Sequence, residues 1–254
     1  MISSEDRGFL YGDSLFETVR LKGGELLWEE RHYARMLNSA RELGFKDERV
    51  GEAFEALHEA SHQHTDGLLR VTLSREGEGV AFGGEGSCHV RWRPCVMPDA
   101  DAFRLCIVEG AYFPQDRLAE HKTGSYLRAV MVRREAIQRG FHDGVRVSLC
   151  GRVGETSTGN IFIVRRGGVV WTPCIEGILP GVMRSVVIER LRAQSVEVEE
   201  REVYVDDLRD GESEEVWVTN VAFGVRGVTE VDAIGFGFKF LKDNDFVDLL
   251  GEAS

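Results

Sequence analysis

The sequence predicts an α+β fold with two domains, and three observations support this prediction. Segments with apolar residues at every second position, typical of strands, recur along the chain together with segments of helical periodicity. The length of 254 residues is enough for two modest hydrophobic cores. The segment 94–101, with two prolines and two aspartates, is the best candidate for a linker. We therefore expect a small domain over residues 1–95, a linker over 96–101 and a larger domain over 102–254.

The predicted small domain contains a hairpin, two helices and two further strands. In the hairpin, the turn Lys22-Gly23-Gly24 joins two strand-like runs. The first helix has its apolar residues on one face and ends at Gly44. In chain order, the expected elements are strands 14–22 and 25–28, helices 29–43 and 46–64, and strands 68–74 and 89–95.

The predicted larger domain is richer in strands. Turns that contain glycine separate its central strands, and Gly181 opens a helix. The expected strands are 103–109, 145–150, 160–165, 169–172, 196–204, 215–219 and 224–234. The expected helices are 126–139, 181–193, 206–210 and 238–250.

The composition bounds the class of protein and its partners. Hydrophobic residues make up 43% and charged residues 29% of the chain, as in ordinary globular proteins. The net charge of −12 disfavours nucleic acids and anionic membranes, which would repel the chain. The five cysteines form no CxxC pair and are odd in number, so we expect reduced thiols in a cytoplasmic protein. No apolar stretch approaches the roughly 20 residues that span a bilayer, and the polar start of the chain does not predict a signal peptide.

Two motifs and one lysine carry the functional prediction. The motifs are Glu155-Thr156-Ser157-Thr158-Gly159-Asn160-Ile161-Phe162 and Gly177-Ile178-Leu179-Pro180-Gly181-Val182-Met183-Arg184. Lys122 stands upstream of both, before Thr123-Gly124-Ser125. This pattern resembles the signature of the fold-type IV pyridoxal-phosphate enzymes, which include the class IV aminotransferases and aminodeoxychorismate lyase. The resemblance implies that the chain is a pyridoxal-phosphate enzyme acting on a small-molecule amine.

The resemblance covers nearly the whole chain, because the segment from Asp6 to Arg20 also resembles the family. It implies a small N-terminal α/β domain and a larger, β-barrel-like C-terminal domain with flanking helices, as in the D-amino-acid aminotransferases. The larger domain would carry the Schiff-base lysine. The resemblance also implies a homodimer, in which the opening segment contributes to the dimer contact.

Lys122 and Glu155 are expected to serve the reactive part of the cofactor. The resemblance assigns Lys122 the Schiff base with pyridoxal phosphate and the role of proton shuttle. Desolvation and the positive charge of the cofactor would both help this lysine to lose its proton. Glu155 would bind the pyridine nitrogen and keep it protonated, so that the ring can accept electrons.

The phosphate of the cofactor is expected to bind at three places. Gly181-Val182-Met183 follows a Pro-Gly turn into a helix, so backbone N–H groups and the helix dipole can face an anion. Arg35 stands in a helix that resembles the family's His-x-x-Arg helix, whose arginine binds the phosphate. His32, three residues earlier, would fix that arginine or the backbone. The loop Asn220-Val221-Ala222 resembles a third contact, made through its backbone.

A metal site is not expected. Among His58, His62 and His64 there is the i, i+4 spacing that suits a metal ion, but carboxylate or cysteine partners are lacking nearby. A solvated helix face is the better interpretation of these histidines.

Two reactions fit the predicted residues. A lyase would convert 4-amino-4-deoxychorismate to p-aminobenzoate and pyruvate, whereas a class IV aminotransferase would act on D-amino or branched-chain amino acids. Lys122 and Glu155 serve both reactions, and the compact length and Met183 favour the lyase. A cofactor-free scaffold of the same fold is less favoured, because Lys122, Glu155 and Arg35 are all intact.

The substrate-binding positions should separate these reactions. Arg75 is a candidate to bind a substrate carboxylate, but Val80 occupies the place where a second arginine is expected. Arg70 or Arg20 could replace that arginine. Phe16 stands where the D-amino-acid aminotransferases favour a tyrosine, which argues modestly against that branch.

Overall fold

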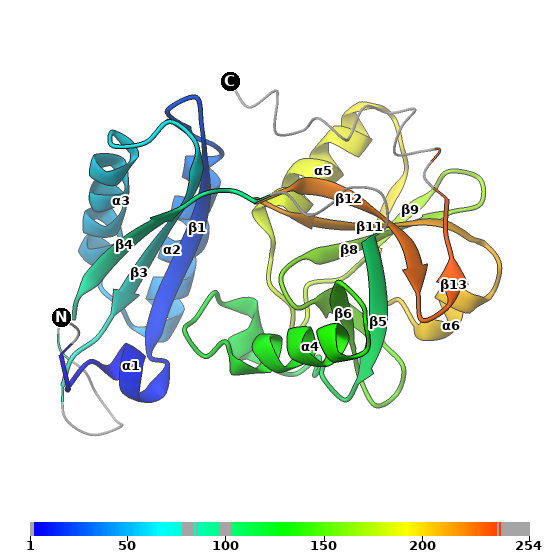
Figure 1. Ribbon diagram of the computed structural model, residues 1–254, viewed down its shortest axis with the longest axis horizontal. Helices are drawn as coiled ribbons and strands as arrows, with labels where there is room; N and C mark the ends of the chain where they lie inside the picture. The colour runs from blue at the N-terminus through cyan, green and yellow to red at the C-terminus, as the bar shows by residue number, and fades with distance from the viewer. Residues whose placement is uncertain (1–2, 78–83, 85, 97–102, 238, 240–254) are drawn as a thin grey trace. The chain divides into compact units, whose positions relative to one another are not determined.

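The computed structural model describes residues 3–77, 84, 86–96, 103–237 and 239 (Figure 1). The chain divides into two compact units: unit 1 is Met1–Val96 with His121–Tyr126, and unit 2 is Met97–Glu120 with Leu127–Ser254. The sequence placed Lys122 in the larger domain, whereas in the structure its segment groups with unit 1. Residues 97–101 of the expected linker, and the expected helix 238–250 apart from Lys239, lie outside the described residues.

In its described residues, unit 1 contains one antiparallel sheet and three helices (Figure 1). The strands pair in the order β2-β1-β3-β4. Its helices are α1 (Arg7–Tyr11), α2 (Glu29–Leu43) and α3 (Asp47–Ser61). Its strands are β1 (Ser14–Lys22), β2 (Glu25–Leu26), β3 (Gly67–Ser74) and β4 (Cys88–Arg93).

The core of unit 1 lies between the sheet and the helices α2 and α3. Leu15 and Val19 of β1 and Leu69 and Val71 of β3 are buried there together with apolar residues of both helices. Because side chains alternate along a strand, the intervening residues, such as Phe16, belong to the opposite face of the sheet. This face is called the open face of unit 1 below.

Unit 2 is built on a mixed sheet of nine strands. Eight of them follow the order β10-β9-β8-β11-β12-β5-β6-β7, and β13 pairs with β12. The strands are β5 (Phe103–Glu109), β6 (Asp143–Val147), β7 (Val153–Thr156), β8 (Asn160–Arg165), β9 (Val170–Pro173), β10 (Val198–Arg201), β11 (Ser213–Asn220), β12 (Gly224–Val231) and β13 (Ile234–Gly235). The helices are the 3-10 turn η1 (Arg117–Glu120), α4 (Leu127–Gln138), α5 (Val182–Ala193) and α6 (Val205–Arg209).

The middle of the unit 2 sheet is covered on both faces. β5 and β6 run parallel and α4 lies between them in the chain, as a parallel pairing requires. Val145 and Val147 of β6 belong to the main core, while Cys106 of β5 packs with Val132 and Ala136 of α4 on the other side. The predicted α+β class is confirmed in both units.

The structure differs from the sequence prediction mainly where the chain turns. The short elements α1, β7 and β13 were not predicted, because two to five residues carry too little periodicity. The predicted strand 145–150 ends at Val147, since Ser148 N–H donates to the C=O of Arg152 and closes a tight turn. The predicted strand 224–234 is broken at Asp232 and Ala233, which both have a positive φ.

Leu69→Ala is expected to lower the free energy of unfolding by about 2–5 kcal/mol, because it leaves a cavity in the core of unit 1. Urea denaturation followed by circular dichroism measures the change. Leu149→Ala is the matched control, since this side chain is 88% exposed and its loss should change stability by less than about 0.5 kcal/mol. Equal effects of the two substitutions would contradict the placement of this core.

Candidate active site

The segment His121–Tyr126 is held in unit 1 by backbone hydrogen bonds to β1. Phe16 N–H donates to the C=O of Lys122 at 2.9 Å, and Gly124 N–H donates to the C=O of Ser14 at 2.9 Å. These bonds extend the edge of β1 like a short extra strand. They are the physical reason that Lys122 belongs to unit 1.

The side chains of Lys122 and Arg70 meet at the ring of Phe16. Lys122 Nζ lies 4.6 Å from the ring centroid, and the guanidinium carbon of Arg70 lies 3.5 Å from it. Tyr126 packs edge-on against the same ring, with the centroids 5.6 Å apart. The structure therefore brings together the expected Schiff-base lysine and two of the expected substrate residues.

Beneath this group, Glu17 forms a buried ion cluster with His32 and Arg35. Glu17 lies on the inward face of β1, and both His32 and Arg35 come from α2. Arg35 donates from Nε to Oε1 at 2.8 Å and from Nη2 to Oε2 at 2.7 Å. Burial acts to raise the pKa of Glu17, but the charge of Arg35 and the hydrogen bonds from His32 and Arg35 lower the pKa well below its usual range. Glu17 is therefore a carboxylate that fixes the orientation of Arg35.

His32 is held as a neutral imidazole by the same cluster. Burial lowers its pKa against the opposing effect of Glu17, and the charges of Arg35 and Lys122 lower the pKa further. Nδ1 lies 2.8 Å from Glu17 Oε2, so in the neutral ring Nδ1 carries the proton and donates it. Nε2 is then an acceptor, and it is buried without a hydrogen-bond partner within the described ranges. The sequence predicted that His32 would fix the arginine or the backbone; in the structure His32 binds Glu17, which in turn binds Arg35.

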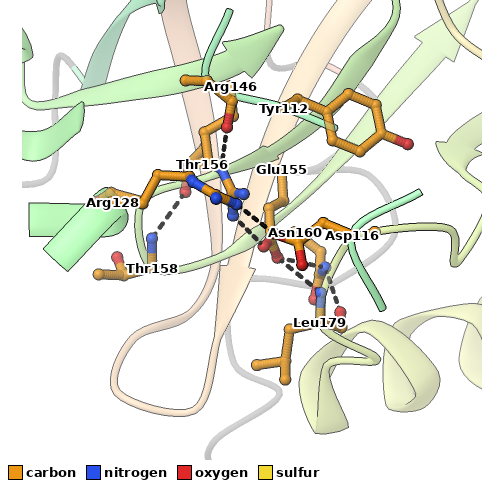
Figure 2. Close-up of polar contacts among 12 residues, drawn as sticks. Tyr112, Asp116, Arg128, Arg146, Glu155, Thr156, Thr158, Asn160 and Leu179 are labelled. Carbon is orange, nitrogen blue, oxygen red and sulfur yellow. Dashed lines mark hydrogen bonds and ion pairs between the residues drawn. The ribbon is translucent and has the colours of Figure 1, made fainter. Parts of the chain in front are cut away.

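In unit 2, the carboxylate of Glu155 on β7 accepts hydrogen bonds from Arg146, Asn160 and the backbone of Leu179 (Figure 2). Arg146 Nη1 donates to Oε1 at 2.8 Å. Asn160 Nδ2 and the backbone N–H of Leu179 donate to Oε2 at 3.4 and 3.3 Å. Glu155 is buried, so these bonds fix the direction of its oxygen atoms. The arrangement suits a carboxylate that must meet a ring nitrogen at one defined angle.

Gly181 precedes helix α5 at a place where a larger residue would displace the side chain of Asn160. A Cβ atom at this position would collide with Oδ1 of Asn160. Gly181 is the N-cap, and no side chain caps the first turn, which starts with Val182 and Met183. An uncapped first turn presents backbone N–H groups and the positive end of the helix dipole, which together suit a phosphate.

The loop Asn220-Val221-Ala222 is shaped by its own side-chain amide. Asn220 Oδ1 accepts hydrogen bonds from the N–H groups of Ala222 at 2.9 Å and Phe223 at 3.2 Å. Asn220 Nδ2 donates to the C=O of Thr158 at 3.4 Å, which ties the loop to the motif that contains Glu155. Next to the loop, Thr219 Oγ1 is buried and has no partner in the part of the chain that the structure describes.

Arg75 has contacts that favour a structural role over substrate binding. It donates to Asp13 Oδ1 at 3.2 Å and to the C=O of Leu43, and its guanidinium lies 3.8 Å from the ring centroid of Phe45. These contacts draw it away from the ring of Phe16. Arg75 therefore does not join the group around Lys122.

The structure thus arranges the expected residues in two groups, one in each unit. Unit 1 holds Lys122 with Phe16 and Arg70, together with the fixed Arg35, while unit 2 holds the second group. Three observations fit pyridoxal phosphate: a buried and oriented carboxylate, a helix start at a glycine packed against Asn160, and a buried hydroxyl without a hydrogen-bond partner among the described residues. The second group consists of Glu155, Asn160, Gly181, Val182, Met183 and the loop that starts at Asn220.

Two supporting residues, Glu17 and Arg146, were missed in the sequence. Glu17 lies between Leu15 and Val19 on the inward face of β1, and Arg146 stands between Val145 and Val147 in the fully buried strand β6. A charged residue at such a position requires a buried partner of opposite charge, and this pattern is the signal that could have found them. The partner itself could not be read from the sequence.

Metal binding receives no support from the described residues. No group of three or more His, Cys, Asp or Glu side chains among them could hold a metal ion. His58 instead lies beside a carboxylate, with Nε2 at 2.6 Å from Glu29 Oε1.

Comparison with known proteins gives one family and several relatives. A family model described as amino-transferase class IV matches residues 14–231. A "Putative branched-chain-amino-acid aminotransferase" from Methanocaldococcus jannaschii is 28% identical, with 91% of this chain and 83% of the relative covered. Aminodeoxychorismate lyase from Vibrio harveyi is 26% identical, with 90% and 86% covered. The crystal structure of 4-amino-4-deoxychorismate lyase from Pseudomonas aeruginosa has a TM-score of 0.84 at 26% identity, with 98% of this chain and 96% of that chain covered.

Glu17→Gln is expected to lower the free energy of unfolding at pH 7 by about 3–5 kcal/mol, because Arg35 keeps a buried charge without its partner. In the wild type the pKa of Glu17 is lower in the folded than in the unfolded state, so the unfolded state binds more protons. The stabilisation is therefore complete above about pH 5 and declines as the pH falls. Urea denaturation between pH 3 and 7 measures both effects.

The variant should lose this part of the acid dependence. Glu55→Gln, at an exposed position of α3, is the control and should leave the dependence unchanged. Parallel pH curves for the wild type and Glu17→Gln would contradict the role of the cluster.

Proposed function

The chain belongs to the amino-transferase class IV family and is a pyridoxal-phosphate-dependent enzyme, and from this premise we propose that it is a lyase. It converts 4-amino-4-deoxychorismate to p-aminobenzoate and pyruvate. The observation that carries the proposal is the meeting of Lys122 and Arg70 at the ring of Phe16. A reactive amine beside a guanidinium suits a substrate that carries an amine and a carboxylate. The similarity to lyases from Vibrio harveyi and Pseudomonas aeruginosa supports this choice.

In the proposed reaction, Lys122 and Glu155 handle the protons. Bound pyridoxal phosphate supplies a sink for the electrons left when a C–H bond of the substrate breaks. Lys122 Nζ takes the proton from the carbon that bears the amine, and it can return a proton to the departing three-carbon group. The carboxylate of Glu155, oriented by Arg146, holds a proton at the ring nitrogen of the cofactor.

The remaining expected residues bind the cofactor phosphate in this proposal. Arg35 supplies a fixed positive charge, since Glu17 holds two of its three nitrogen atoms in place. The first turn of α5, from Gly181, and the loop at Asn220 supply backbone N–H groups. Each of these contacts acts on a part of the cofactor that does not react.

An aminotransferase acting on branched-chain or D-amino acids is the alternative. The relative from Methanocaldococcus jannaschii favours it, because it is the more similar of the two relatives described above. The same proton chemistry would serve, but a keto acid would have to enter and receive the amine. The two functions therefore differ in whether a keto acid is required.

We include a cytoplasmic setting and a homodimer in the proposal. All five cysteines are free thiols, which suits a reducing compartment. Within the described ranges, no helix has both the length and the apolar character needed to cross a bilayer. Helix α1 exposes Phe9, Leu10 and Tyr11, and such an apolar patch in the opening segment suits a contact between two copies.

The cofactor-loaded protein should release p-aminobenzoate and pyruvate from 4-amino-4-deoxychorismate without any added keto acid. Lys122→Ala should lower kcat by at least about 10²-fold, because the proton acceptor is lost. Lys46→Ala, at an exposed position, is the control and should retain activity. Product detection by liquid chromatography measures both variants.

If the enzyme forms no p-aminobenzoate but transfers the amine of an amino acid to an added keto acid, the aminotransferase replaces the lyase as the function. A cofactor-loaded protein inactive in both assays would contradict both functions.

The homodimer is tested by light scattering after gel filtration, where we expect twice the mass of one chain. Phe9→Glu should shift the protein toward the monomer, because it places a charge in the proposed contact. Leu149→Glu, at an exposed turn of unit 2, should leave the mass unchanged. A wild type that elutes as a monomer would contradict the proposal.

A further inference from the structure

The open face of unit 1 carries a set of arginines in register. In one row across the sheet, Thr18 of β1 pairs with Arg70 of β3, which pairs with Arg91 of β4. In the next row, Leu68 of β3 lies between Arg20 and Arg93. Residues directly opposite each other on paired strands have Cβ atoms about 4.5–5.5 Å apart. Arg70 and Arg91 are therefore side-by-side cations on the face that also carries Phe16.

Within the described strands, no carboxylate lies in the two rows that hold Arg70, Arg91 and Arg93; Glu25 of β2 lies opposite Lys22. The residues of β1, β3 and β4 on the open face include no Asp or Glu, although the chain as a whole has a net charge of −12. Within the described residues, Arg70, Arg91 and Arg93 make no ion pair, and Arg70 Nε donates only to the hydroxyl of Thr72 at 3.2 Å. Like charges directly opposite each other destabilise a sheet, so a bound anion would stabilise the pair of Arg70 and Arg91.

The environment of Arg70 agrees with such an anion. Burial lowers the pKa of Arg70, Tyr126 acts in the opposite direction, and the charges of Arg91 and Arg93 lower the pKa further. A carboxylate bound to Arg70 would offset its repulsion with Arg91 and Arg93. The fork of an arginine is well suited to it, because two parallel N–H groups match the two oxygens of a carboxylate.

Protection of an edge strand is the simpler explanation, and it accounts for only part of the pattern. β4 is the last strand of its sheet, and charged side chains on an edge discourage pairing with other chains. That explanation covers Arg91 and Arg93. It gives no reason for a cation at Arg70, which lies on an interior strand directly opposite Arg91.

We propose that Arg91 binds a second carboxylate of the substrate while Arg70 binds the first, so that the site selects dianionic amines over monoanionic ones. Arg91 is thus a specificity-determining residue that sequence reasoning did not identify. The inference rests on the proposed function, because it assumes that the substrate amine reacts at Lys122 beside Phe16. It gives a physical basis for the lyase, whose substrate carries two carboxylates, in place of the arginine missing at Val80.

Binding of unreactive probes tests this inference without turnover. Titration calorimetry on the cofactor-loaded enzyme compares benzoate, with one carboxylate, and isophthalate, with two. Since a charge-assisted pair contributes at least about tenfold in affinity, the wild type should bind isophthalate about tenfold more tightly. Arg91→Gln should remove that preference and leave benzoate binding within about twofold. Arg70→Gln should weaken both probes.

Two matched variants separate a specific contact from a general charge effect. Arg134→Gln removes one exposed arginine from α4 in unit 2 and should leave the isophthalate preference unchanged. Arg91→Lys keeps the charge without the fork and should restore part of the preference. Urea midpoints within error of the wild type establish that these variants fold.

The inference is overturned if Arg91→Gln weakens both probes equally, if Arg134→Gln has the same effect, or if the wild type shows no preference for isophthalate. These outcomes are independent of the lyase assay, because neither probe carries an amine. An enzyme that shows the preference but forms no p-aminobenzoate would retain this inference and lose the proposed reaction.

Discussion

The buried carboxylate of Glu17 is the interaction on which the arrangement of unit 1 depends. It joins β1 to α2 by accepting hydrogen bonds from His32 and Arg35. Loss of one partner would leave a charge in an apolar interior, at a cost of about 3–5 kcal/mol. Phe16 directly precedes Glu17 on β1, and its backbone N–H donates a hydrogen bond to the C=O of Lys122. The position of Lys122, the reactive amine in our proposal, therefore depends on the strand that this ion cluster joins to α2.

Unit 2 also contains a buried carboxylate–arginine pair, but with a different role. Glu155 is also a buried carboxylate bound by an arginine, Arg146, whose Nε donates to a backbone carbonyl at 3.0 Å and is thereby fixed. Replacing such pairs by apolar residues would often preserve or increase stability, so stability alone does not explain them. Their orientation does, because an arginine that is itself fixed also fixes the direction of the carboxylate it binds. One carboxylate orients a protein cation, Arg35, and the other is directed at the cofactor in our proposal.

The sequence predicted what depends on local pattern, and it failed where distant segments meet. The long alternation of β1 and the apolar face of α2 predicted both elements, and the motif around Glu155 led to the family. The placement of Lys122 in unit 1 could not be predicted, because it depends on hydrogen bonds between β1 and a segment about 100 residues later. Arg146 stands between two valines in the sequence, which marks it as a buried charge, but its partner was set by the pairing of β6 with β7.

The alternation of side chains along β3 places Arg70, but not Arg75, where it can bind the substrate in our proposal. Arg70 lies on the open face, whereas Arg75, just beyond the end of β3, is directed to Asp13 and the ring of Phe45. An arginine satisfied in this way stabilises the fold and has little to offer a ligand. Arg70 differs, because its repulsion with Arg91 directly opposite destabilises the sheet when no anion is bound. A ligand that binds only the folded protein stabilises it. A dianion that removes the repulsion between these arginines would therefore gain that energy as binding affinity. A local positive face on a chain of net charge −12 also attracts anions to the face that carries Lys122.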